Sequence, residues 1–188
     1  KIAHWCRSVK KEYKTAFIAT FIMGLLIHMP AILSDVPNHD GLGSMYFDQN
    51  MITSGRWFLS VVCGISSFYD LNWVIGVLSV FYLALAAVLV CEFFELKSMV
   101  NRMLTAALLV TFPAVCATFA YMYTMDGYMI GLILSVLAAY LAKCGKKSVA
   151  IGAVCLGLSL GIYQAYLAVT ILLCIFDLMK DCLCGHKI

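Results

Sequence analysis

Charged residues divide this chain into uncharged runs whose lengths match the thickness of a lipid bilayer. Three such runs contain 20, 21 and 23 residues and occupy positions 15–34, 71–91 and 103–125. A helix needs roughly 20 apolar residues to cross a hydrocarbon core of about 30 Å. The chain is 63% hydrophobic and 12% charged, whereas soluble domains are about 45–50% apolar and about 25% charged. The sequence therefore predicts an all-α integral membrane protein and excludes a water-soluble enzyme.

Two further uncharged runs follow, of 16 residues at 127–142 and of 29 residues at 148–176. The longer run fits either one long tilted helix or a hairpin of two short spans. We favour the hairpin, because Gln164 is the only amide in the run and a polar apex suits the membrane interface. The prediction is one transmembrane domain over 1–188 with about six spans, at about 15–34, 71–91, 103–125, 127–142, 148–163 and 165–179. The first span follows a basic stretch but is too long for a signal peptide, so we expect a retained anchor.

The basic residues orient the predicted spans. Twelve of the 13 Lys and Arg residues lie on one side of a six-span topology, and Arg56 alone lies on the other. The positive-inside rule then places both termini in the cytoplasm. The formal net charge of +3 gives no reason to expect a nucleic-acid partner. The lipid bilayer is the expected surrounding of the whole chain.

Polar residues gather on the predicted outer side. The loop at 34–58 contains a dense polar set in an otherwise apolar chain: Asp35, His39, Asp40, Asp48, Asn50 and Arg56. The 13 uncharged residues after Arg56 are too few to span a bilayer, so this loop should lie in the interface. Asp126 falls on the same side, where burial of a lone carboxylate is costly and indicates a function. The polar hairpin apex at 163–166 adds a third segment at this face, at the height of a lipid-linked phosphate.

These residues resemble a family. In their order and spacing, four motifs resemble the N-terminal half of bacterial O-antigen glucosyltransferases of the Gtr type II family. The motifs are His39-Asp40-Gly41, Gly55-Arg56-Trp57, Asp126 in the segment YMYTMDGYM, and Tyr163-Gln164-Ala165-Tyr166. The resemblance implies a GT-C-like membrane module that transfers glucose from a polyprenyl-phosphate donor to a cell-surface glycan acceptor. It also implies a multi-pass protein of the bacterial cytoplasmic (inner) membrane. Members of that family are much longer, so this chain is expected to be a fragment of a longer enzyme.

Inverting glycosyl transfer requires a carboxylate base near the acceptor hydroxyl and a counter-charge for the departing phosphate. The resemblance places Asp40 in the role of base. Asp126 is expected to share the site, either holding the acceptor or ligating a divalent cation, Mg²⁺ or Mn²⁺, together with Asp40. Arg56, the only outer cation, suits the donor phosphate because its guanidinium binds phosphate oxygens with two hydrogen bonds. The remaining expected substrate-binding residues are His39, Trp57, Tyr163 and Gln164.

Two other classes of function stay open at this point. A polytopic transporter would place ionisable residues at mid-span and would contain broken helices or internal repeats. The interiors of the predicted spans carry no charge and the sequence contains no internal repeat, which favours the glycosyltransferase. A non-catalytic membrane subunit is the other alternative, and the short length of the chain is compatible with it.

Overall fold

The computed structural model describes residues 10–34, 52–63 and 71–184, and these residues contain helices, turns and connecting loops but no strand. The element bounds are α2 (Lys11–Leu33), α4 (Leu59–Val62), α5 (Asn72–Phe93), α6 (Met99–Thr111), α7 (Pro113–Thr118), the 3₁₀ helix η1 (Phe119–Thr124), α8 (Met125–Lys143), α9 (Lys146–Ile162) and α10 (Tyr166–Cys184). The expected all-α class is therefore found throughout the described part of the chain.

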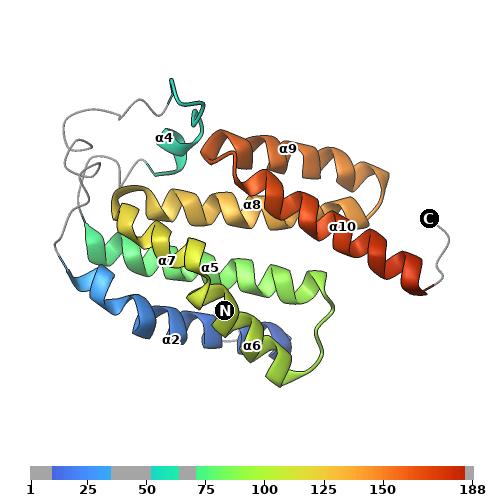
Figure 1. The fold of residues 1–188 in the computed structure, drawn as a ribbon, viewed down its shortest axis with the longest axis horizontal. Coiled ribbons are helices and arrows are strands. Elements are labelled where there is room, and N and C mark those ends of the chain that lie inside the picture. Colours follow the sequence, from blue (N-terminus) through green and yellow to red (C-terminus); the bar gives the residue numbers. More distant parts are fainter. Residues whose placement is uncertain (1–9, 35–51, 64–70, 185–188) are drawn as a thin grey trace, which may run out of the picture.

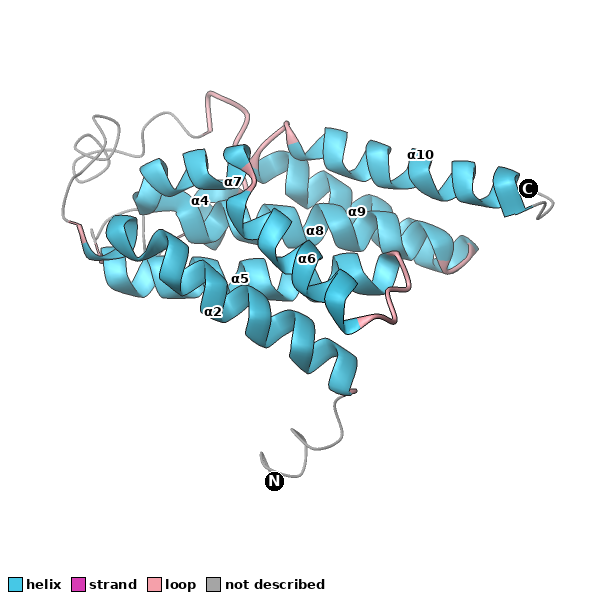
Figure 2. Cartoon of the chain, turned by 60° about the horizontal axis from the view of Figure 1, so that its bottom comes forward, coloured by secondary structure: helices cyan, strands magenta, loops and turns pink. Residues whose placement is uncertain are grey.

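The long helices run roughly side by side, so the bundle has two ends (Figure 1). α8 lies centrally and contacts α5, α9 and α10, while α2 packs against α5 and α6 (Figure 2). We call one end the apex end; it holds the α9–α10 turn, α4 and the start of α8. The opposite end holds every described Lys and Arg except Arg56, and we call it the basic end. The charge asymmetry expected from the sequence is thus a real asymmetry of the fold.

Small residues and short polar side chains bring the helices close together. A Cβ added to Gly76 of α5 would lie 2.5 Å from Ile32 Cγ1 of α2, and one added to Gly24 of α2 would lie 2.7 Å from Val80 Cγ1 of α5. On the other side of the bundle, the Ser159 hydroxyl of α9 donates to the backbone carbonyl of Gly131 in α8 at 2.8 Å. Close backbone approach and interhelical hydrogen bonds of this kind are typical of helices packed within membranes.

The expectation of six spans is not supported. Among the residues that the structure describes, three helical segments are long and apolar enough to cross a membrane, judged by length and composition: Lys11–Leu33, Asn72–Phe93 and Pro113–Lys143. α6 has only 13 residues and α9 has 17, which is short for a hydrocarbon core of about 30 Å. α10 has 19 residues but carries Asp177, Lys180 and Asp181 near its end. The described part of the chain therefore forms an apolar helical bundle with three segments of spanning length.

The segment expected as a span at 103–125 is broken, and Pro113 is the reason. Phe112 is extended (φ −60°, ψ 128°) and ends α6, because a residue that precedes proline disfavours the helical conformation. The break leaves carbonyls in the last turn of α6 without helical donors. His28 Nε2 lies 3.0 Å from the Val110 carbonyl oxygen, and since a carbonyl only accepts, this nitrogen carries the proton. The His28 ring also stacks on Phe119 of η1, with centroids 3.7 Å apart.

The 29-residue apolar run is divided into two helices, as the hairpin alternative required. α9 ends at Ile162 and α10 begins at Tyr166, with the chain reversing over 163–165. Tyr163 is extended (φ −156°, ψ 122°). The reversal places Tyr163 and Gln164 at the apex end of the bundle (Figure 1).

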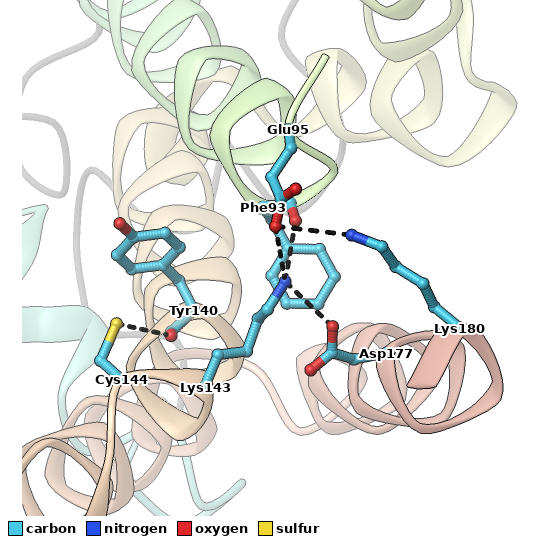
Figure 3. A network of polar contacts seen from close by, with 7 residues as sticks. All are labelled: Phe93, Glu95, Tyr140, Lys143, Cys144, Asp177 and Lys180. Carbon is cyan, nitrogen blue, oxygen red and sulfur yellow. Dashed lines mark hydrogen bonds and ion pairs between the residues drawn. The ribbon is translucent and has the colours of Figure 1, made fainter. Parts of the chain in front are cut away.

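An ionic cluster joins three helices at the basic end (Figure 3). The Lys143 ammonium at the end of α8 lies 2.9 Å from Asp177 Oδ1 of α10 and donates to the Phe93 carbonyl oxygen of α5 at 3.1 Å. Glu95, just after α5, lies 3.4 Å from the ammonium of Lys180 in α10. The Lys143 and Asp177 side chains are 22% and 21% exposed. This cluster fixes α10, whose outer face otherwise exposes large apolar side chains.

We expect the substitution Lys143→Met to destabilise the bundle by about 1–3 kcal/mol, because it leaves a largely buried carboxylate and a carbonyl without their donor. The free energy of unfolding is measured in detergent by denaturant titration. Lys146→Met, at an exposed position at the start of α9, is the matched control and should change stability by less than about 0.5 kcal/mol. Equal effects of the two substitutions would show that the cluster does not hold α10.

Candidate functional site

Arg56 stands in a tight turn before α4 at the apex end. The Gly55 backbone N–H donates to the Ile52 carbonyl oxygen at 3.0 Å, and Gly55 has φ = +80°. This conformation favours glycine, because an L side chain is strained at positive φ. The Arg56 carbonyl oxygen then accepts from the Leu59 N–H at 3.0 Å, which leads the chain into α4. The local sequence Gly-Arg-Trp thus builds a turn that carries a cation.

The α9–α10 hairpin holds this turn in place. The Phe58 backbone N–H donates to the Gly161 carbonyl oxygen at 2.8 Å. The Gln164 side-chain amide donates to the Ser54 carbonyl oxygen at 3.3 Å. Trp57 packs on Gly161, where an added Cβ would lie 2.6 Å from the indole atom Cε2. Two segments about a hundred residues apart in sequence therefore form one unit.

The Arg56 guanidinium lies among tyrosines. Arg56 Nη1 donates to the Tyr128 hydroxyl at 3.3 Å, and Arg56 Cζ lies 5.2 Å from the centroid of the Tyr163 ring. The two rings meet edge to face with centroids 5.5 Å apart, and the Tyr163 ring also meets that of Tyr166. A guanidinium has five N–H donors, and the described contacts use one of them. A partly buried cation with donors to spare is suited to bind an anion with several oxygens.

Asp126 lies in the first turn of α8, at the same end of the bundle, and is 5% exposed. Its Oδ1 accepts from the Gly127 N–H at 2.9 Å. Gly127 packs against α4, with Leu59 Cδ1 2.8 Å from the position of an added Cβ. The start of a helix favours a carboxylate, because the N-terminal N–H groups carry partial positive charge. Asp126 is therefore a buried carboxylate beside the helix that follows the Arg56 turn.

The structure brings four of the expected site residues together: Arg56, Trp57, Tyr163 and Gln164. Gln164 and Trp57 contact the protein itself, so their described contacts position the turn. His39 and Asp40 lie outside the described residues, and their expected roles stay predictions. Among the residues that the structure describes, no group of three or more His, Cys, Asp or Glu side chains is placed to hold a metal ion. A divalent cation at Asp126 thus depends on Asp40 and also stays a prediction.

The sequence reasoning missed two residues of this site. Tyr128, which accepts the hydrogen bond from Arg56, lies only two positions after Asp126, and the many tyrosines at the ends of the apolar runs were the available signal. Gly161 is the second; its role depends on Trp57, which lies more than a hundred residues away in sequence. The sequence around Gly161 contains no pattern that predicts a contact with Trp57.

The substitution Gly161→Ala should displace Trp57 and with it the Arg56 turn, because the added methyl group would overlap the indole ring. We expect glucosyl transfer, the activity that the family resemblance implies, to fall about tenfold or more, since misplacement by about 1 Å can cost up to about a hundredfold. The measurement combines a transfer assay with iodide quenching of tryptophan fluorescence. Gly157→Ala is the matched control: it lies on the same helix, is exposed and has no atom within 4 Å of an added Cβ. If both variants keep normal transfer, the hairpin does not position the turn.

Comparison with known protein families gives one finding. A family model described as glucosyl transferase GtrII matches residues 29–187, which include every residue of the site described above. Searches of the curated proteins and of the solved structures gave no significant match.

Proposed function

The chain belongs to the glucosyl transferase GtrII family, and we propose from this premise that it moves a glucosyl residue from a polyprenyl-phosphate donor to a cell-surface glycan. The site at the apex end of the bundle is where we place the reaction. The expected GT-C architecture, with a chain that forms part of a longer enzyme, belongs to the same proposal.

The observation that carries this proposal is the Arg56 guanidinium seated between Tyr128 and Tyr163. Apart from Arg56, the described part of the apex end contains no Lys or Arg. A lipid phosphate approaching this end would therefore meet one cation, already oriented by aromatic rings. The exposed apolar faces of the surrounding helices suit a donor whose carrier is itself a long hydrocarbon.

The reaction that we propose has three linked changes. The acceptor hydroxyl gives its proton to Asp40 as its oxygen forms a bond to the anomeric carbon of glucose. The bond between that carbon and the phosphate oxygen breaks, and the electron pair leaves with the polyprenyl phosphate. Arg56 stabilises the charge that develops on the departing phosphate. Asp126 holds the acceptor or, with Asp40, a divalent cation; His39 and Trp57 complete the substrate contacts.

The orientation follows from the basic end. Positively charged ends of membrane helices are retained in the cytoplasm, so we place the N-terminus and the basic end inside the cell. The apex end then faces outward from the cytoplasmic membrane. A donor that has been carried across the membrane on a lipid would be used at that face.

A transporter was one of the two alternatives that the sequence left open, beside a non-catalytic membrane subunit, and transporters also use broken helices such as the one at Phe112. Here the freed Val110 carbonyl is bonded to His28, so the described contacts already satisfy it within the protein. Family membership favours the glucosyltransferase.

The decisive experiment compares sugar donors. The complete protein, reconstituted in lipid, is given radiolabelled glucose either as polyprenyl-phosphate glucose or as a nucleotide-linked glucose, each with a purified glycan acceptor. We expect transfer only from the lipid-linked donor. Transfer from the nucleotide donor alone would overturn the proposed donor and, with it, the role of Arg56.

A further inference from the structure

A cavity with charged walls lies at the basic end, far from the candidate site. It occupies about 340 Å³ between the start of α2, the end of α5 and the start of α6. Six charged side chains line it: Lys10, Lys97 and Arg102, and Glu12, Glu92 and Glu95. The lining therefore combines three positive and three negative groups, with a formal sum of zero. The glucosyl transfer proposed above uses none of these residues.

Few of these charges form ion pairs inside the described structure, and the Lys10 ammonium and the Glu92 carboxylate both interact with the Tyr13 hydroxyl. Glu95 pairs with Lys180, but among the described residues no ion pair within 4.0 Å joins Lys10, Lys97, Glu12 or Glu92 to another charged side chain. Lys10, Glu12, Glu95 and Lys97 are exposed at this cavity, so their charges are accessible to a ligand that carries groups of both signs.

Arg102 gives the cavity a fixed cationic wall. It is 7% exposed, and its Nη2 donates to the Leu96 carbonyl oxygen in the connection between α5 and α6. The Lys10 ammonium lies 5.3 Å from the centroid of the Tyr13 ring. One cation is therefore buried and held by the backbone, while a second is placed over an aromatic ring at the rim.

The helices below the cavity are apolar on their outer faces. Ile18 and Ile22 of α2 are 53% and 52% exposed, and Met103 and Leu104 of α6 are 44% and 56% exposed. α2 and α6 lie side by side (Figure 2). A polar cavity at the end of an apolar helix pair matches the division of a phospholipid into headgroup and acyl chains.

We propose that this cavity, the headgroup pocket, binds the phosphoethanolamine headgroup of a membrane phospholipid. Arg102, Lys97 and Lys10 bind the phosphate diester, while Glu92 and Glu12 accept hydrogen bonds from the primary ammonium. A purely anionic headgroup would leave the carboxylates uncompensated. A choline headgroup carries a positive charge but no N–H to donate, so ethanolamine is the headgroup that satisfies both sets of charges.

The test measures lipid binding and does not depend on glucosyl transfer. The complete protein is placed in nanodiscs of phosphatidylglycerol mixed with equal amounts of either phosphatidylethanolamine or phosphatidylcholine. Bound lipid is counted by native mass spectrometry after transfer to detergent, and the unfolding midpoint is recorded. We expect selective retention of phosphatidylethanolamine and a higher midpoint in its presence, because a ligand of the folded state stabilises it.

Variants locate the binding. Glu92→Gln and Lys97→Gln should each lower phosphatidylethanolamine retention about tenfold, since each removes a charge-assisted hydrogen bond. Lys147→Gln, at an exposed position of the basic end outside the cavity, should retain the lipid normally. Equal retention of the two zwitterionic lipids would overturn the proposal, as would unchanged selectivity in both cavity variants.

Discussion

Arg56→Ala is expected to lower kcat/KM for glucosyl transfer from the lipid-linked donor about 10²–10³-fold, the cost of removing one group that stabilises charge in a transition state. The guanidinium is held by Tyr128 at 3.3 Å and lies over Tyr163, so no neighbouring cation in the described structure replaces it. Arg56→Lys should be intermediate, because the charge is kept while the two-pronged geometry is lost. The measurement is steady-state transfer at several donor concentrations.

The matched control for Arg56 is Lys147→Ala, which removes an exposed positive charge at the opposite end of the bundle. Its transfer rate should equal that of the unmodified protein. If Arg56→Ala retains more than about a third of normal kcat/KM while Gly161→Ala is impaired, the turn matters but Arg56 does not bind the phosphate. The amount of protein inserted in the membrane is measured in parallel, so that a lower yield of inserted protein is not mistaken for a lower rate of transfer.

Asp40→Asn is expected to lower kcat about 10²–10⁴-fold, as typically follows the loss of a general base. The amide keeps the shape of the side chain but does not take the acceptor proton. The acidic limb of the pH–rate profile should disappear together with the rate, because that limb reports protonation of the base. Asp48→Asn, in the same outer loop, is the control and should leave transfer unchanged.

Asp126→Asn separates the two roles left open for this carboxylate. If Asp126 holds the acceptor, the substitution should raise KM for the glycan; if it ligates a cation, it should change the dependence of kcat on Mg²⁺ or Mn²⁺. The hydrogen bond from the Gly127 N–H is available to the amide oxygen as well, so the local fold should persist. Normal kinetics in both assays would remove Asp126 from the site.

Charge spacing predicted the long helices well, for a physical reason. The runs at 15–34, 71–91 and 127–142 correspond to α2 (Lys11–Leu33), α5 (Asn72–Phe93) and α8 (Met125–Lys143). An ionised side chain is costly in an apolar surrounding, so charges mark where such helices begin and end. The reversal near Gln164 was found in the same way, from a single polar residue in a long apolar run.

The same reasoning failed at 103–125, because it counted charges and ignored Pro113. The residue before a proline disfavours the helical conformation whatever its hydropathy, and α6 ends at Thr111, whereas α2 continues through Pro30. The bond between His28 and Val110 joins residues 82 positions apart and has no signature in either segment. Long-range contacts of this kind also explain why Tyr128 was missed while Arg56, beside it in space, was found.

The contact between Gln164 and Ser54 spans 110 residues of sequence, and this has a consequence for biogenesis. A ribosome adds about 5–20 residues per second, so roughly 5–20 s pass between synthesis of the Arg56 turn and emergence of the hairpin that fixes it. During that interval the turn has neither the Gly161 carbonyl nor the Gln164 amide to bond. Membrane insertion of the first helices can therefore be complete while the site is still unassembled, and truncated chains that end before α9 should insert normally yet lack a positioned arginine.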